Sequence, residues 1–245
     1  MATTVISGSS SISNKTLTDV LVSGSDAMLY VRSGGRVVSA TTTNNGNIYL
    51  ISGGKCEIAS FLSGGELFIY SGSASKVNIG SGGFLGIYGD GSKSNSVAIA
   101  YTTTISSGGT MFLNYAGAAN GTTVLNGGQL ILGGYSSSFG SYGYNYAFDT
   151  TLSGGSMAIG YKARAEKNFI YSSIYSSGRL FVSSGGTATS NYVSAGGSLI
   201  VDGSATSNYI YSGGSMGVSS GGIASSNTVS AVVHFEYHIV GHKVR

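Results

Sequence analysis

Apolar and polar residues alternate in short runs that recur along this 245-residue chain at a nearly constant spacing. In each unit, the second and fourth residues after a fixed origin are apolar, as Leu180 and Val182 are after Gly178. An alternation with period two predicts a β-strand that buries one face. The ten origins are Ala27, Gly46, Gly65, Gly83, Gly109, Gly128, Gly155, Gly178, Gly197 and Gly214. Most lie about 19 residues apart, so the chain is built from an internal repeat.

Two further inward-facing rows are predicted in each unit. The first row is mostly small and comprises Val37, Cys56, Ala74, Ala119, Ala188, Ala205 and Ala224. The second lies about four residues before the next origin and comprises Phe61, Ile79, Ile105, Val124, Ile174, Val193 and Ile210. Glycine pairs such as Gly185 and Gly186 permit the positive φ angles of sharp corners, and together with the inward rows they imply a three-sided coil. One polar position also repeats and predicts a structural amide ladder at a turn, made by Asn168, Asn191, Asn208 and Asn227.

A unit of about 19 residues is too short for a strand, a helix and a returning strand, but it suits one rung of a parallel β-helix. The sequence therefore predicts an all-β parallel β-helix, or solenoid, of about ten rungs, which would be a rod about 48 Å long. Proline, which would remove a donor from the ladder, does not occur in the sequence. We expect residues 1–26 to form an N-terminal cap or first irregular rung, residues 27–230 the repeat domain, and residues 231–245 a C-terminal cap or irregular tail.

The composition narrows the class of protein further. The 41 glycines and 9% charged residues would suit a flexible linker, but 41% hydrophobic residues at fixed offsets provide a core. The net charge of +3 is spread along the chain, which argues against a nucleic-acid partner. The sequence contains neither a basic start followed by an apolar stretch nor a long apolar run, so we expect no signal peptide and no membrane insertion.

Patterns for catalysis and metal binding are weak. Histidine occurs only in the tail, at His234, His238 and His242, without a clear ligand spacing, so we predict no metal and no cofactor. The serines thus lack an upstream histidine, and the nine carboxylates do not cluster in the aligned repeat. Cys56 stands in a row otherwise occupied mainly by alanine, which predicts a core residue and not a reactive thiol. The sequence therefore predicts that the chain is not an enzyme.

The units that begin at Gly83, Gly128 and Gly155 are longer than the rest, and insertions in repeat proteins normally form loops on one face. The candidate ligand-binding residues lie in the middle insertion and are Tyr135, Phe139, Tyr142, Tyr144 and Tyr146. Such rings either contact sugars or another protein, or fold back to cover the side of the rod. The third long unit mixes charges with aromatic residues, as a solvated strand face or a site would, through Lys162, Arg164, Glu166 and Lys167.

The unit from Gly178 to Gly197 reads Gly-Arg-Leu-Phe-Val-Ser-Ser-Gly-Gly-Thr-Ala-Thr-Ser-Asn-Tyr-Val-Ser-Ala-Gly-Gly and resembles the AIDA-type repeat of self-associating bacterial autotransporter adhesins. The resemblance extends from about Ala27 to Val229. It implies a right-handed β-helical passenger domain, secreted or displayed on a Gram-negative cell, that acts in adhesion, self-association or biofilm formation. The implied partners are other copies of the chain, or host surface glycans and proteins. The family's signal peptide and translocator barrel have no counterpart in this sequence.

Members of that family are O-heptosylated on repeat serines by a dedicated glycosyltransferase. The resemblance therefore implies such an enzyme as a partner, and modification at the matching serines Ser33, Ser52, Ser63, Ser107, Ser153 and Ser184. Two other functions stay open on the same fold. One is a phage or surface protein that binds or depolymerises polysaccharide, and the other is a purely structural spacer.

Overall fold

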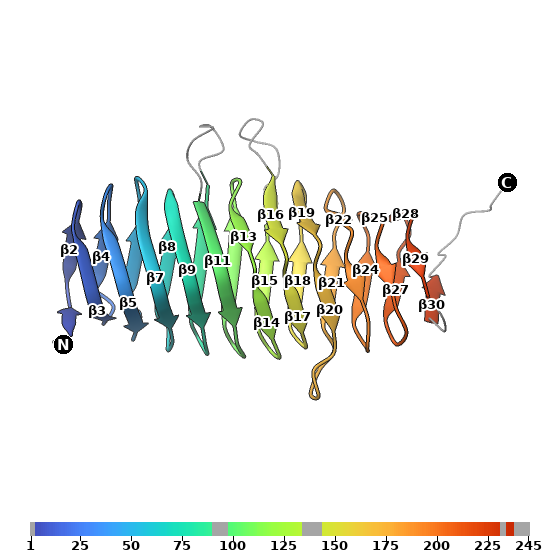
Figure 1. Cartoon of the computed structure of the whole chain (residues 1–245), viewed down its shortest axis with the longest axis horizontal. Helices are drawn as coiled ribbons and strands as arrows, with labels where there is room; N and C mark the ends of the chain where they lie inside the picture. Colours follow the sequence, from blue (N-terminus) through green and yellow to red (C-terminus); the bar gives the residue numbers. More distant parts are fainter. Residues whose placement is uncertain (1–2, 90–97, 134–143, 231–233, 238–245) are drawn as a thin grey trace.

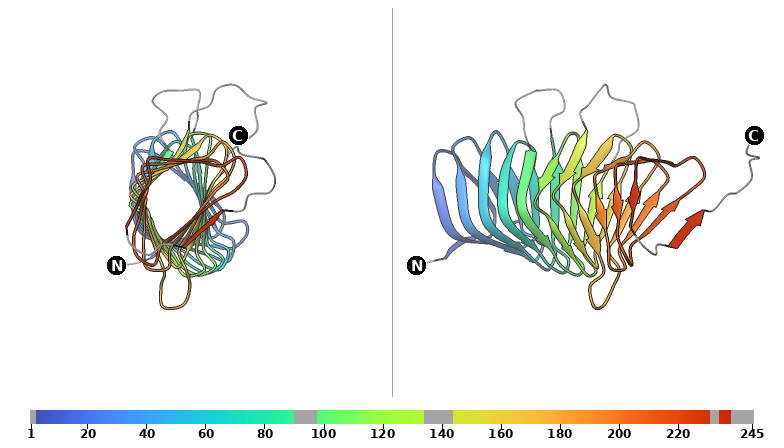
Figure 2. Two further views of the ribbon diagram at one scale, coloured as in Figure 1. Left: turned by 90° about the vertical axis from the view of Figure 1, so that its right-hand side faces the viewer. Right: turned by 45° about the vertical axis from the view of Figure 1, so that its right-hand side comes forward.

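The computed structural model describes residues 3–89, 98–133 and 144–230, together with the strand His234–Tyr237. These residues form a parallel β-solenoid of about 11 turns with rungs of about 19 residues, and the described part contains no helix (Figure 1). The predicted all-β solenoid is thereby confirmed. Viewed along the rod, the successive turns superpose as a closed coil (Figure 2).

One side of the coil is a sheet of 12 strands, each of which pairs in parallel with the strand one turn away. Its strands are β2 (Ser9–Ile12), β4 (Met28–Val31), β6 (Asn47–Leu50), β8 (Glu66–Ile69), β10 (Phe84–Tyr88), β12 (Thr110–Asn114), β15 (Gln129–Leu132), β18 (Ser156–Ile159), β21 (Arg179–Val182), β24 (Ser198–Val201), β27 (Ser215–Val218) and β30 (His234–Tyr237). All ten predicted origins directly precede a strand of this sheet.

The rest of each turn belongs to a second, 18-stranded parallel sheet that bends around the core. In the first turns, long strands pass through the bend: β3 (Thr16–Ser23), β5 (Arg36–Thr43), β7 (Gly54–Phe61), β9 (Gly72–Ile79) and β11 (Ala98–Ile105). After β11 the bend separates two short strands per turn: β13 (Ala118–Asn120) and β14 (Thr123–Leu125), β16 (Asn145–Phe148) and β17 (Thr151–Ser153), β19 (Ala163–Glu166) and β20 (Phe169–Tyr171), β22 (Thr187–Thr189) and β23 (Tyr192–Val193), β25 (Ser204–Thr206) and β26 (Tyr209–Ile210), and β28 (Ile223–Ser225) and β29 (Thr228–Val229). The remaining strand, β1 (Thr4–Ile6), pairs with β3. Residues 4–23 thus stack in register on the repeats.

The core is a set of columns in which equivalent side chains stack from turn to turn. Leu180 and Val182 are buried and align with Leu199 and Val201 of the next turn, as the alternation predicts. In the small-residue row, Cys56 is buried and aligns with Ala74.

Two residues predicted to face inward are exposed. The prediction for Ile174 is wrong, because its side chain is 88% exposed and Ile170 lies in the buried column between Leu152 and Val193. The prediction placed the inward residue about four positions before the next origin. It failed in this unit because extra residues project from the coil between β20 and that origin (Figure 1). Ala224 is exposed because β28 belongs to the outermost turn of the described 18-stranded sheet.

The two glycines of each corner are required for different reasons. The first adopts a left-handed conformation, with φ of 76° at Gly185, which costs little only without a side chain. The second packs against the backbone of the preceding turn, since a Cβ at Gly186 would lie 2.7 Å from the Ile159 carbonyl oxygen. The repeated Gly-Gly pair therefore both turns the chain and lets adjacent rungs approach.

The predicted amide ladder is present along the bend of the last turns, where Asn168, Asn191 and Asn208 are buried. The Nδ2 of Asn168 donates to Oδ1 of Asn191 at 2.7 Å, Asn191 donates likewise to Asn208 at 2.8 Å, and Asn208 to Asn227 at 2.9 Å. Each acceptor oxygen also receives the backbone N–H of the preceding asparagine, at 2.8–3.1 Å. The ladder satisfies polar backbone and side-chain groups that the core shields from water.

Candidate functional site

Five of the six candidate glycosylation serines lie on the glycine corners that flank the 12-stranded sheet. The exposed corner serines are Ser33, Ser52 and Ser184, which follow strands of this sheet, and Ser63 and Ser107, which precede them. Ser52 and Ser63 have positive φ values of 53° and 49°, so the serines themselves take part in the turn. The corners stack through backbone hydrogen bonds, for example from the Ser63 N–H to the Ser81 carbonyl at 2.9 Å. The corner serines are therefore accessible hydroxyls that recur along the edges of the rod.

Ser153 differs from the other five. It is the last residue of β17 and is half-buried, because the following corner packs beneath the loop that projects after β20. The N–H of Gly154 in this corner donates to the Tyr171 carbonyl at 3.3 Å. Of the six serines, Ser153 is therefore the least accessible to a modifying enzyme.

Of the candidate ligand-binding aromatic residues, Tyr135, Phe139 and Tyr142 lie outside the described residues. Tyr144 and Tyr146 are described, and their side chains are 49% and 40% exposed. Their rings meet edge to face with centroids 6.3 Å apart. The structure thus brings these two together on an outward surface at the start of β16.

Cationic side chains of the next turn contact the rings at this surface. The Arg164 guanidinium carbon lies 5.8 Å from the centroid of Tyr144, and Lys167 Nζ lies 5.0 Å from that of Phe148. Arg164 also pairs with Glu166 at 3.4 Å. Two of the charged residues of the third long unit, Arg164 and Lys167, therefore make cation–π contacts that hold the rings in place.

Two stacks of outward-facing rings were missed by the sequence reasoning. On the 12-stranded sheet, Tyr30 stacks on Tyr49 at 4.9 Å and Tyr49 on Phe68 at 5.2 Å. On the other sheet, Tyr192 stacks between Phe169 and Tyr209 at 5.1 and 5.2 Å. The available signal was an aromatic residue at one outward offset in consecutive units. Within each stack the neighbouring ring faces cover one another, so these contacts stabilise the rod.

The pKa shifts of Cys56 and Glu57 have structural causes in burial and in ion pairing, respectively. Burial raises the pKa of the Cys56 thiol to about 12, so it is protonated and inert at neutral pH. Glu57 accepts hydrogen bonds from Arg36 at 2.9 and 2.6 Å, and this pairing lowers the pKa of the Glu57 carboxyl. Across residues 3–89, 98–133 and 144–230, no three His, Cys, Asp or Glu side chains are grouped closely enough to hold a metal ion. His238 and His242 lie outside the described residues.

None of the segments that the structure describes is a helix long and apolar enough to cross a membrane. No protein family model matches the chain, and no curated protein sequence is significantly similar to it.

The stacked Gly-Gly corners and the parallel rungs define a repeat protein of the parallel β-solenoid class. Among solved structures, the TibC-catalysed hyper-glycosylated TibA55-350 fragment matches with a TM-score of 0.69 and 26% sequence identity. The match covers 96% of this chain and 92% of that fragment. It confirms the predicted resemblance to the AIDA-type passenger domains of self-associating autotransporter adhesins.

Proposed function

We propose that the chain is the adhesive passenger of a bacterial cell surface, which associates with copies of itself after sugars are added to its corner serines. The observation that carries this proposal is the match to a hyper-glycosylated fragment over nearly the whole rod, together with five exposed serines on the two glycine corners that flank the 12-stranded sheet. A rigid rod that repeats one contact many times gains avidity from weak individual contacts. Such a surface needs no catalytic group and no cofactor.

The same comparison supports a glycosyltransferase as a partner, since the matching fragment was glycosylated by TibC. A transferase that acts on a folded rod needs a protruding hydroxyl on a short turn, and the corner serines supply that geometry. We infer that Ser33, Ser52, Ser63, Ser107 and Ser184 are modified first, and that the half-buried Ser153 is modified last.

The proposed modification is tested by co-expressing the chain with a heptosyltransferase that modifies AIDA-type passenger domains and then measuring the intact mass of the chain. We expect mass increments of one heptose each, with five fewer sites when the five exposed serines are replaced by alanine. The matched control replaces Ser60 and Ser75, which lie within strands β7 and β9 and are half-buried, and should keep the full set of increments. An unmodified wild-type chain would contradict the proposed modification.

Self-association is tested separately by displaying the chain on bacteria and following sedimentation of the culture. Cells that display the wild-type chain should settle faster than cells that display the five-serine variant. If cells that display the wild-type chain, cells that display the variant and cells without the chain all settle at the same rate, the adhesive function is contradicted and the spacer role remains.

We also propose the aromatic surface at Tyr144 and Tyr146 as a contact for the partner, because these rings are exposed and held by Arg164. Replacing both tyrosines by serine should slow sedimentation without changing the mass increments. Replacing Tyr30, whose ring face is covered by Tyr49, is the control and should leave sedimentation unchanged.

A further inference from the structure

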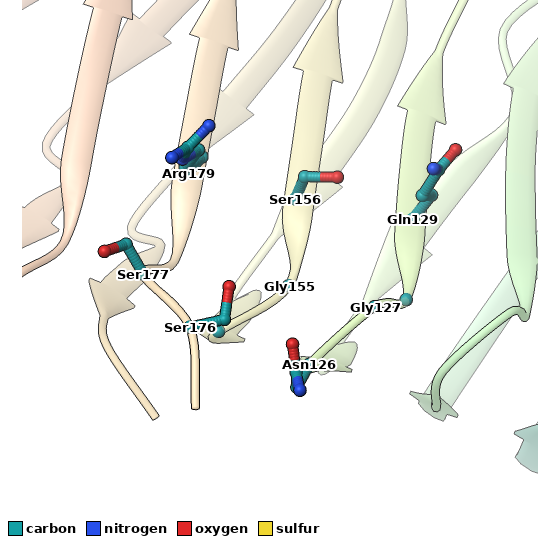
Figure 3. Close-up of a pocket in the computed structure, with 10 residues that line it drawn as sticks. Asn126, Gly127, Gln129, Gly155, Ser156, Ser176, Ser177 and Arg179 are labelled. Carbon is teal, nitrogen blue, oxygen red and sulfur yellow. The ribbon is translucent and has the colours of Figure 1, made fainter. Parts of the chain in front are cut away.

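A hollow of about 300 Å³ lies at the corners of the coil where β15, β18 and β21 begin (Figure 3). It is lined by Asn126, Gly127, Gly128, Gln129, Gly154, Gly155, Ser156, Ser176, Ser177 and Arg179. The stacking of turns changes here, because Leu125 and Gly154 form an isolated antiparallel bridge whereas the named strands pair in parallel. The hollow is thus a local departure from the repeat.

The walls of the hollow follow from the strand register. Gln129, Ser156 and Arg179 are the first residues of β15, β18 and β21, and they are aligned directly across the three strands. Neighbouring strands lie about 4.8 Å apart, so Gln129 and Arg179 stand about 10 Å apart with Ser156 between them. A short side chain between two long ones leaves the space open, as the view onto the three strands shows (Figure 3).

The loop that closes one end of the hollow is held in a fixed conformation. The Ser173 hydroxyl oxygen accepts the N–H groups of Tyr175 at 3.2 Å and Ser176 at 3.1 Å, and the Ser173 N–H donates to the Ser176 carbonyl at 2.8 Å. The hydroxyls of Ser176 and Ser177 are therefore placed by a preformed turn. A ligand would not have to order this loop on binding.

The chemistry of the lining is cationic and rich in hydrogen-bond donors. The Arg179 side chain is exposed, and its guanidinium makes no ion pair or hydrogen bond with any residue that the structure describes. None of the lining residues is acidic. Gln129 lies on the strand across from Arg179 and Asn126 on the corner that precedes that strand, and their amides offer both donors and acceptors (Figure 3).

We propose that this hollow binds one carboxylate-bearing sugar residue of an acidic polysaccharide. The planar guanidinium of Arg179 pairs with the sugar carboxylate, and the amides and serine hydroxyls contact the ring hydroxyls. An inorganic anion would contact the Arg179 wall but leave the Gln129 wall, about 10 Å away, without a partner. An apolar ligand finds no apolar wall, since the lining is glycine, serine, amide and guanidinium. This site goes beyond the proposed self-association and does not depend on it.

The test is a titration of the full chain, unglycosylated, with methyl glucuronide and with the neutral methyl glucoside, followed by NMR chemical shifts. We expect the glucuronide to bind more tightly than the glucoside, with shifts at residues of the hollow. Arg179→Gln should weaken glucuronide binding about tenfold or more and leave glucoside binding unchanged. Arg32→Gln is the matched loss of an exposed arginine elsewhere and should change neither.

A second pair of variants tests the shape of the site. Ser156→Leu fills the space between Gln129 and Arg179 and should abolish binding of both sugars. Ser215→Leu places the same side chain at the equivalent position of β27, outside the hollow, and should leave binding intact.

Three results would overturn the proposal: no binding of either sugar, equal binding of both sugars, or displacement of glucuronide by equimolar inorganic phosphate. The last result would indicate a general anion site. Sedimentation of cells that display the chain is measured independently of sugar binding. Absence of sugar binding together with normal sedimentation would contradict this site but not the adhesive function.

Discussion

The first and last turns of the solenoid bend at the same place but fill the bend with different chemistry. Up to β11, long strands run through the bend, and its inward column is apolar from Val20 through Ala40, Ala59 and Val77 before it reaches Thr103 in β11. From β20 onward, short strands flank the bend, and the column is the hydrogen-bonded ladder that begins at Asn168. The backbone path is nevertheless similar, since a left-handed residue occupies the bend in both regions, Ile58 in one and Ser190 in the other.

The difference shows that the shape of the coil does not depend on one kind of core. An apolar column is a sum of independent contacts, because each methyl group packs on its neighbours without needing a partner. An amide ladder is a connected network, because each amide leaves another donor or acceptor unpaired when it is lost. We therefore expect mutations in the two regions to differ in how far their effects spread.

The largest loss in the free energy of unfolding is expected when the amide ladder is broken in its middle. Asn191→Ala removes the acceptor for both N–H groups that Asn168 donates, and should lower the free energy of unfolding by about 3 kcal/mol. Asn227→Ala, at the partly buried end of the ladder, should cost about 1 kcal/mol. Urea unfolding followed by circular dichroism measures both, and equal losses would mean that the ladder is not a connected network.

The second prediction concerns the Gly-Gly corners, which the two regions share. Gly35→Ala and Gly186→Ala place a Cβ 2.8 Å from the Arg32 carbonyl oxygen and 2.7 Å from that of Ile159, respectively. Both should lower the free energy of unfolding by about 2 kcal/mol, because the corner packs equally tightly in both regions. Gly217 is the control, since a Cβ there meets no atom within 4 Å and Gly217→Ala should be neutral or slightly stabilising. A loss confined to one region would show that the corners differ as well.

Most of the repeat was predictable from the sequence, because each rung obeys local rules. The alternation at Leu180 and Val182, the burial of Cys56 and the amide ladder all follow from one residue type at one offset. The position of Ile174 was not predictable, because an insertion shifts the count within a unit and only the strand register reveals which isoleucine faces inward.

The surface was less predictable than the core. The hollow around Ser156 depends on the alignment of three units of unequal length, which is set by pairing between turns and not by spacing along the chain. The stacked rings of Tyr30 and Tyr49 likewise require the register of adjacent strands. The sequence showed which units are long, but it did not reveal the hollow or the stacked rings, which depend on the pairing between turns.

A smaller effect tests the strain at the bend. Ile58 has a φ of 55°, which is unfavourable for a β-branched residue, and its side chain is 49% exposed. Ile58→Asn should raise the free energy of unfolding by about 1 kcal/mol, because asparagine adopts this conformation more readily. Ser190→Asn, at the equivalent bend residue of the other region, should change the stability less. A loss of stability in Ile58→Asn would mean that packing of the isoleucine outweighs its backbone strain.

The smallest effect concerns the outward ion pairs of the two regions. Glu57 accepts two hydrogen bonds from Arg36 of the preceding turn, whereas Arg164 and Glu166 pair within one strand at 3.4 Å. The pairing with Arg36 lowers the folded-state pKa of the Glu57 carboxyl below its unfolded value. The pair therefore stabilises the fold at pH values above the unfolded pKa, and this contribution is lost as the pH falls through the folded pKa.

NMR titration of the Glu57 carboxyl should show this lowered pKa in the wild type and a return toward the ordinary value in Arg36→Gln. Arg164→Gln, which removes the pair in the other region, should leave the Glu57 pKa unchanged. Because both partners are more than a third exposed, the pH dependence of stability should be weak and should diminish further in high salt. A Glu57 pKa that does not respond to Arg36→Gln would show that contacts between turns on this outer face are too mobile to distinguish the two regions.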